Sequence, residues 1–156
     1  MKIGVYPGSF DPITNGHLDV LKRSLKVFDK VILLLAVNPS KKSHFSIEER
    51  LRMMKEAVKD LKDVEVDFTD GLTVDYCIKH NSTSIIRGLR AVTDFEYEFQ
   101  LAAANEFCNP EVDMVFFMAR KDEMFISSSA IDQMYENGVD ISPLVPPCVL
   151  EAYKRK

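Results

Sequence analysis

Residues 7–17 combine glycines, which permit tight backbone turns, with side chains that can bind an anion. Gly8 is expected to permit a tight bend, so that backbone amides near Ser9 and Phe10 can approach a phosphate. His17 follows a second glycine and is expected at the start of a helix, where free N–H groups favour an anion. The imidazole of His17 can also donate to that anion. The segment contains neither a Walker A loop nor a G-x-G-x-x-G motif.

Three later segments carry further groups that could bind phosphate. Lys41 and Lys42 are adjacent cations that would attract a second anionic group. Arg87 and Arg90 are three residues apart, so that both guanidinium groups can reach phosphate oxygens in a bidentate manner. The run Ser127–Ser129 offers hydroxyls and amides to another phosphate. The shared chemistry is binding of small polyanions.

Each feature also has a structural interpretation. Pro-Gly and Asn-Gly pairs are common in loops, a single histidine is often structural, and a lysine pair is ordinarily solvated. One serine of the run could be a helix N-cap. The two arginines could form an ion-pair network with the acidic residues that follow them, Asp94, Glu96 and Glu98. The combination, rather than any one motif, favours a binding site.

Strand and helix patterns alternate along the chain and would position these groups. Short apolar runs predict five strands, at Ile3–Tyr6, Val31–Val37, Val64–Phe68, Thr83–Ile86 and Met114–Met118. Helical spacing predicts helices in between, and two more follow the fifth strand. Such alternation is typical of an α/β fold, a Rossmann-like doubly wound five-stranded parallel sheet in a single domain. Ligands bind such sheets beyond the carboxyl ends of the strands, which is where these segments fall.

Capping boxes are predicted to begin two of the helices. Ser46 with Glu49 would open one helix, and Thr93 with Glu96 would open another that runs to Phe107. The buried face of the first helix is predicted from helical spacing to comprise Ile47, Leu51, Met54, Val58 and Leu61.

The composition is that of one soluble domain, and we expect it to span residues 1–156. The 24 acidic and 20 basic residues give a net charge of −4, which argues against a dedicated nucleic-acid binder. Three cysteines without a C-x-x-C pair support neither a zinc site nor a disulfide framework. No segment has the pattern of a signal peptide or a membrane span, so a cytoplasmic protein without membrane contacts is expected.

Four stretches are shared with a known family: the run from Tyr6 to His17 with its T-x-G-H signature, Ile86–Arg90, Asp94–Glu98 and Ile126–Ser129. Over essentially the whole chain the sequence resembles the bacterial phosphopantetheine adenylyltransferases of the nucleotidylyltransferase superfamily. The resemblance implies transfer of AMP from ATP to 4′-phosphopantetheine, which gives dephospho-coenzyme A and pyrophosphate. It also implies Mg²⁺ as cofactor, a homohexamer and feedback inhibition by coenzyme A.

The resemblance also implies roles for particular residues. His17 would stabilise the transition state. The acceptor would be bound by Ser9, Lys41, Thr73 and Arg87. ATP would be bound by Ser9, Phe10, His17, Gly88, Leu89, Arg90, Glu98, Glu123, Met124, Phe125, Ile126, Ser127, Ser128 and Ser129. No protein ligand set for a metal is implied.

The chemistry of this reaction agrees with the residues present. Two anionic substrates must be brought together, so positioning and charge stabilisation suffice and no covalent nucleophile is needed. Two alternatives remain. One is another nucleotidylyltransferase, such as a nicotinamide mononucleotide adenylyltransferase, and the other is a non-catalytic sensor of nucleotides or coenzyme A.

Overall fold

The computed structural model describes residues 1–120 and 126–156. Five parallel strands form one sheet in the order β3-β2-β1-β4-β5, with the bounds β1 (Ile3–Gly8), β2 (Lys30–Ala36), β3 (Val64–Thr69), β4 (Ser84–Leu89) and β5 (Asp113–Met118). The predicted α/β, Rossmann-like class is confirmed. Because the chain winds outward from β1 in both directions, the sheet has its topological switch point between β1 and β4.

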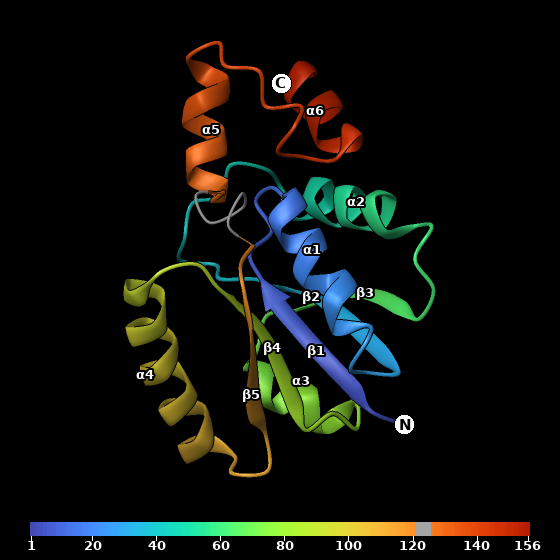
Figure 1. Ribbon diagram of the computed structural model, residues 1–156, viewed down its shortest axis with the longest axis vertical. Coiled ribbons are helices and arrows are strands. Elements are labelled where there is room, and N and C mark those ends of the chain that lie inside the picture. Colours follow the sequence, from blue (N-terminus) through green and yellow to red (C-terminus); the bar gives the residue numbers. More distant parts are fainter. Residues whose placement is uncertain (121–125) are drawn as a thin grey trace.

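Helices cover both faces of this sheet (Figure 1). Their bounds are α1 (Asn15–Ser24), α2 (Ile47–Val58), α3 (Thr73–Lys79), α4 (Val92–Cys108), α5 (Ser128–Glu136) and α6 (Pro147–Lys154). In Figure 1, α1 lies in front of the strands and α3 behind them, while α5 and α6 lie beyond the carboxyl end of β1. None of the described helices combines the length and the apolar character that a bilayer crossing needs.

Strand β2, which lies between β3 and β1, shows why the core has two halves. Val31, Leu33 and Leu35 pack into one apolar cluster, whereas Ile32 and Leu34 pack into another on the opposite face. Successive side chains of a strand point to opposite faces, so a strand buried on both faces needs an uninterrupted apolar run. The seven-residue apolar run in the sequence therefore has a direct structural cause.

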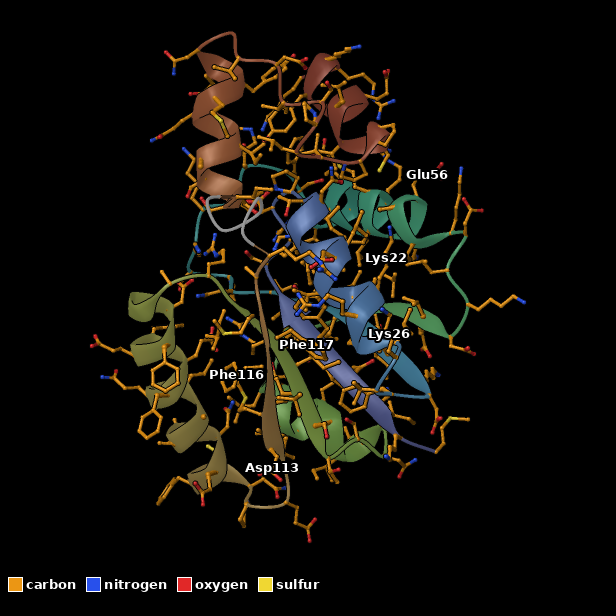
Figure 2. The ribbon with its side chains drawn as sticks, viewed as in Figure 1. Lys22, Lys26, Glu56, Asp113, Phe116 and Phe117 are labelled. Atoms are coloured by element: carbon orange, nitrogen blue, oxygen red, sulfur yellow. The ribbon has the colours of Figure 1, made fainter. Side chains whose placement is uncertain are left out.

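The outer strand β5 follows the same alternation. Phe116 points toward α4 and Phe117 toward α1, as Figure 2 shows. The guanidinium of Arg23, on α1, lies 5.6 Å from the centre of the Phe117 ring and donates to the Met118 carbonyl at 2.7 Å. These contacts fix the carboxyl end of β5 against the helix that follows β1.

The two predicted capping boxes have different outcomes. The first is confirmed: the Ser46 hydroxyl accepts from the Glu49 amide at 3.1 Å, and the Glu49 carboxylate accepts from the Ser46 amide at 3.0 Å. The second is wrong, because α4 begins at Val92 and Thr93 therefore lies inside the helix rather than at its N-cap. The carboxylate of Asp94 instead accepts from the backbone amide of Arg90.

The predicted inner face of α2 is confirmed at Met54 and Val58, which are buried, and at Leu51 and Leu61, which pack against the same core, but not at Ile47. Ile47 is 37% exposed, and the buried residues are Arg50, Met53, Met54 and Val58. A charged side chain thus occupies the inner face of this helix. The sequence pattern assigned that face to apolar residues alone.

Candidate functional site

A cleft of about 790 Å³ lies at the switch point, where the carboxyl ends of β1 and β4 diverge. Five stretches of chain line it, within residues 6–20, 36–50, 87–98, 119 and 126–132. The cleft brings together most of the residues predicted from sequence, namely Ser9, Phe10, His17, Lys41, Arg87, Gly88, Arg90, Glu98, Ile126, Ser127, Ser128 and Ser129. Segments far apart in the sequence therefore meet at one rim, as predicted.

Five predicted site residues are not placed in the cleft. Thr73, the first residue of α3, and Leu89, which is 8% exposed, are absent from the lining formed by the described residues. Glu123, Met124 and Phe125 lie outside the described part of the chain.

The loop after β1 turns at Phe10 rather than at Gly8. Phe10 has a φ of 40°, in the left-handed region. The bend expected at Gly8 is not there, because Gly8 has no positive φ and is the last residue of β1. A Cβ on Gly8 would lie 3.1 Å from the Phe10 ring, so glycine is needed there for space. The Phe10 ring is 2% exposed and stands edge-on to Tyr6 and His17, with centroids 5.5 and 4.9 Å away. Phe10 thus supports the histidine with its side chain.

His17 is held as a neutral donor. Its Nδ1 accepts from the Thr14 backbone amide at 3.0 Å, as part of the capping box that begins α1. The remaining proton of the neutral imidazole is therefore on Nε2. Burial, and then the positive charges of Arg90 and Arg87, lower the pKa of His17 to about 4. At neutral pH this side chain can donate a hydrogen bond in the cleft without carrying a charge.

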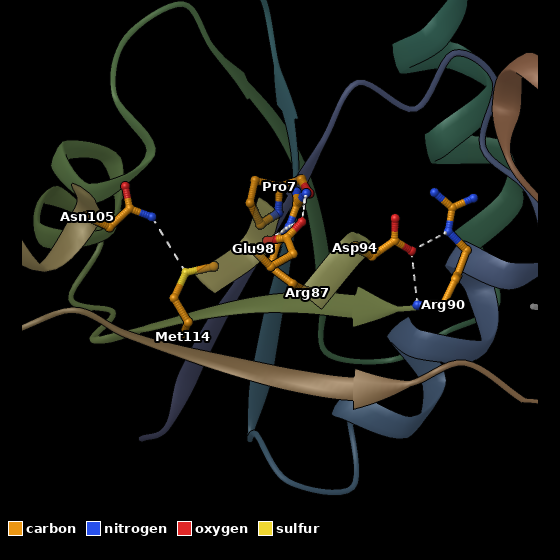
Figure 3. Close-up of polar contacts among 7 residues, drawn as sticks. All are labelled: Pro7, Arg87, Arg90, Asp94, Glu98, Asn105 and Met114. Atoms are coloured by element: carbon orange, nitrogen blue, oxygen red, sulfur yellow. Dashed lines mark hydrogen bonds and ion pairs between the residues drawn. The ribbon is translucent and has the colours of Figure 1, made fainter. Parts of the chain in front are cut away.

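Arg87 is fixed by a carboxylate and a carbonyl. Its Nε donates to both oxygens of Glu98 at 3.0 Å, and its Nη1 donates to the Pro7 carbonyl at 3.2 Å (Figure 3). Glu98 is only 4% exposed, so this ion pair is sheltered from water. The pairing that sequence analysis offered as an alternative is thus present, and it leaves Arg87 on the lining of the cleft.

Arg90 is held in a similar way at the end of the same strand. Asp94 accepts from its backbone amide at 3.1 Å and lies 3.4 Å from its Nε, as Figure 3 shows. Its Nη1 donates to the Ile126 carbonyl at 2.9 Å, which links β4 to the start of α5. Each arginine of β4 and its exit is therefore paired with one carboxylate of α4.

The serine run has distinct structural roles at the start of α5. Ser127 is the N-cap, and its hydroxyl accepts from the Ala130 amide at 3.2 Å. Ser128 donates from its hydroxyl to the Pro12 carbonyl at 2.9 Å. Both serines and Ser129 line the cleft, so the helix N-terminus and its amides face this space.

The opposite wall of the cleft comes from the loop between β2 and α2. Lys41 and Lys42 are exposed and line the cleft. Asp11 fixes the end of this loop, because its carboxylate oxygens accept from the backbone amides of His44 at 2.6 Å and Phe45 at 2.8 Å. Sequence analysis missed this role of Asp11, since nothing local links it to residues more than thirty positions away.

A second anchor ties the same loop to the last two helices. The His44 Nε2 lies 3.3 Å from the Asp132 carboxylate of α5, and the Tyr153 hydroxyl of α6 donates to that carboxylate. The ammonium group of Lys156 donates to the His44 carbonyl. Burial raises the pKa of Asp132, and the hydrogen bond from Tyr153 and the proximity of His44 oppose that effect.

Arg50 is a further lining residue that sequence analysis missed. It is 6% exposed, and it donates from Nη1 to the Ser9 carbonyl at 3.1 Å and from Nε to the Ser46 carbonyl at 3.4 Å. Arg50 lies three residues before Met53 and four before Met54, so the helical spacing could have indicated that it shares their buried face. A charged residue at core spacing on a helix indicates a buried polar role.

The described carboxylates that line the cleft are not grouped as the ligands of a metal site. Asp11, Asp94, Glu98 and Asp132 each accept hydrogen bonds or ion pairs from protein groups. Within residues 1–120 and 126–156, no group of three His, Cys, Asp or Glu side chains is arranged to hold a metal ion.

A parallel sheet with cationic side chains and helix N-termini around its switch point defines a nucleotide-binding α/β protein. Residues 5–134 match the family model described as cytidylyltransferase-like. Three relatives, each with the name phosphopantetheine adenylyltransferase, align over all 156 residues. They are 49% identical in Clostridium tetani, 47% in Desulfosudis oleivorans and 46% in Caldanaerobacter subterraneus, and the alignments cover 98%, 93% and 98% of those proteins. The chain therefore belongs to the cytidylyltransferase-like family and, within it, to the phosphopantetheine adenylyltransferases.

Proposed function

We propose that this chain transfers AMP from ATP to 4′-phosphopantetheine and releases dephospho-coenzyme A and pyrophosphate, with residues 1–156 acting as one nucleotidylyltransferase domain. The names of its full-length relatives support this reaction. The observation that carries the proposal is the neutral His17 in a cleft that also contains two arginines and two lysines. Such a cleft suits two anionic substrates that must be brought into contact.

In this reaction a phosphate oxygen of the acceptor attacks the α-phosphorus of ATP. A new P–O bond forms, the bond from the α-phosphorus to the bridging oxygen breaks, and pyrophosphate leaves with that electron pair. The acceptor phosphate carries a second pKa of about 6, so it is already largely ionised near neutral pH and needs no strong base. The Nε2–H of His17 would donate to the oxygens on which charge develops.

The remaining residues would bind and orient the substrates. Ser9, Lys41 and Arg87 would hold the acceptor at its phosphate, and Thr73, outside the described lining of the cleft, would contact its pantetheine arm. The ion pair with Glu98 fixes the guanidinium of Arg87 before substrate arrives. Gly88, Leu89, Arg90 and Glu98, together with the segment that includes Glu123, Met124, Phe125, Ile126, Ser127, Ser128 and Ser129, would bind ATP. The backbone of Ser9 and Phe10 and the side chain of His17 would serve the same ligand.

Mg²⁺ would accompany ATP and neutralise charge on its phosphates. The carboxylates of the cleft are engaged with protein partners, so the ion would depend mainly on phosphate and water oxygens. We also propose inhibition by coenzyme A, whose structure contains that of the product, and action in the cytoplasm, where ATP is supplied.

A homohexamer is a further part of this proposal. Apolar side chains of α4 are exposed, among them Phe95 at 51%, Phe99 at 66% and Phe107 at 92%. A row of exposed aromatic residues on one helix supports a contact between subunits. Light scattering that gives the mass of one chain would contradict this assembly.

The direct test is an assay with ATP, Mg²⁺ and 4′-phosphopantetheine that follows dephospho-coenzyme A by mass. Acceptor-dependent product is expected. Pyrophosphate released only with nicotinamide mononucleotide or a phosphorylated alcohol would instead identify a different nucleotidylyltransferase. Tight ATP binding without turnover of any acceptor would identify a sensor.

A further inference from the structure

Two charged side chains are buried among the described residues, and they differ in their partners. Glu98 is 4% exposed and forms an ion pair with Arg87. Arg50 is 6% exposed, yet it forms no ion pair with a carboxylate in the described part of the chain. The buried acid is thus neutralised within the protein, and the buried base is not.

The hydrogen bonds of Arg50 leave part of its guanidinium free. Nη1 donates to the Ser9 carbonyl and Nε donates to the Ser46 carbonyl. Within residues 1–120 and 126–156, Nη2 has no hydrogen-bond partner, although Arg50 lines the cleft. The two carbonyls hold the side chain in one orientation, and the remaining donors can serve a ligand.

No fully buried side-chain nitrogen of the described residues lacks a hydrogen-bond partner, so the unpartnered Nη2 of Arg50 opens onto the cleft. The rest of this side chain is removed from water without a counter-ion, which is unfavourable in the free protein. Arginine does not lose its proton to avoid this cost, because its guanidinium stays charged in proteins. An anion bound in the cleft would supply the missing charge, and its hydrogen bonds to the guanidinium would be charge-assisted. The free donors and the missing counter-ion therefore both indicate an anionic ligand.

We propose that Arg50 is a further phosphate-binding residue, which donates from its guanidinium to the phosphate of the acceptor beside Ser9 and Lys41. The bond from Nη1 to the Ser9 carbonyl places Arg50 next to Ser9, and Lys41 lines the same cleft. This inference rests on the proposed function, which assigns Ser9 and Lys41 to the acceptor. It adds a residue from α2, an element to which neither the motifs nor the resemblance gave a role in binding.

The test compares two ligands that differ only in the phosphate, 4′-phosphopantetheine and pantetheine. Calorimetric titration of the full chain gives the Kd of each ligand and of ATP. In the variant Arg50→Met, the affinity for 4′-phosphopantetheine should fall by about tenfold or more, which corresponds to about 1.4 kcal/mol. The affinities for pantetheine and ATP should each change by less than about threefold, since the lost bond is to one phosphate.

Arg52→Met is the matched control, because Arg52 lies on the same helix and is exposed. It removes the same charge and should leave all three affinities unchanged. Arg50→Met that binds 4′-phosphopantetheine as tightly as the wild type would overturn the inference. An equal loss of affinity for all three ligands would also overturn it, because it would indicate a purely structural role.

A second variant covers the case in which Arg50→Met does not fold. Arg50→Lys keeps the positive charge, but its single nitrogen cannot serve the Ser9 carbonyl, the Ser46 carbonyl and a phosphate together, so it should weaken 4′-phosphopantetheine selectively in a protein that still folds. Wild-type affinity in Arg50→Lys would overturn the inference. Failure of the proposed function looks different, because the wild-type protein itself would then bind 4′-phosphopantetheine no better than pantetheine.

Discussion

The two cationic walls of the cleft are built differently. On the wall formed by β4 and α4, Arg87 is paired with Glu98 and Arg90 with Asp94. On the wall formed by α2 and the loop before it, Arg50 and the two lysines have no carboxylate partner among the described residues. Both arginines of the first wall have a carboxylate partner, whereas Arg50 and the two lysines of the second wall have none in the described part of the chain, although the Asp11 carboxylate also lines that side of the cleft.

This difference separates two tasks of an anion site. Paired carboxylates fix the direction of each guanidinium before a ligand arrives, but they also weaken its attraction for an anion. Unpaired cations keep their full attraction, but ordered carbonyls or solvent must hold them in place. We infer that the wall of β4 and α4 chiefly sets geometry, and that the wall of α2 chiefly supplies charge.

The largest effect is expected at His17, which lies in the same cleft and belongs to neither wall. His17→Ala should lower kcat by about 10²–10³-fold, because a preorganised donor to the transition state is lost, and binding by either wall should persist. Steady-state kinetics measure this, with circular dichroism as the check on folding. Near wild-type turnover would remove His17 from the mechanism.

Breaking the paired wall should cost stability. Glu98→Gln leaves the guanidinium of Arg87 without its counter-ion, and the free energy of unfolding should fall by about 3 kcal/mol. Denaturant titration measures the change. Glu96→Gln on the exposed face of the same helix is the control and should change stability by less than about 0.5 kcal/mol. Equal effects of the two variants would show that the pair is not buried in the protein in solution.

The burial of His17, together with the positive charges of Arg90 and Arg87, should appear in the pH dependence of stability. The pKa of His17 is about 4 in the folded protein and 6.5 when unperturbed, so the unfolded chain binds more protons between these values. Stability should therefore fall as pH is lowered, by about 2 kcal/mol between about pH 7.5 and about pH 5. Urea titrations of the wild type and of His17→Gln isolate this contribution. An identical pH dependence in both proteins would contradict the lowered pKa.

The smallest effect on stability is expected on the unpaired wall. Lys41→Met removes an exposed charge without a carboxylate partner, so the free energy of unfolding should change by less than about 0.5 kcal/mol. Its affinity for 4′-phosphopantetheine should nevertheless fall. Lys55→Met, at an exposed position on α2, is the control for nonspecific charge effects. If Lys41→Met destabilised the protein as much as Glu98→Gln does, the two walls would not differ in the way we infer.

Local patterns predicted the fold well, because they report on burial and on backbone geometry. The apolar run at Val31–Val37 predicted a strand that is covered on both faces, and the motifs after the strands predicted the rim on which the cleft lies. The start of α4 was misplaced at Thr93, since a capping-box pattern can also occur within the first turn of a helix.

The partners within the site depend on distances that no local pattern contains. Three acids follow the arginines of β4, and the sequence does not reveal that Arg87 pairs with Glu98 while Glu96 stays exposed. That choice depends on how α4 lies against the sheet. Arg50 was missed for a related reason, because a pattern of apolar residues on α2 cannot show that a charged residue shares their buried face.

The anchor formed by His44, Asp132 and Tyr153 links an early loop to the last helix. During synthesis the lysine-bearing loop leaves the ribosome about a hundred residues before Tyr153, at a rate of roughly 5–20 residues per second. For several seconds the nascent chain would therefore contain β1 and β2 without the contacts of Asp132 and Tyr153 that fix the loop after β2. A ribosome stalled before α6 would carry a chain that has most of its sheet but lacks the hydrogen bond from Tyr153 to Asp132 at the cleft.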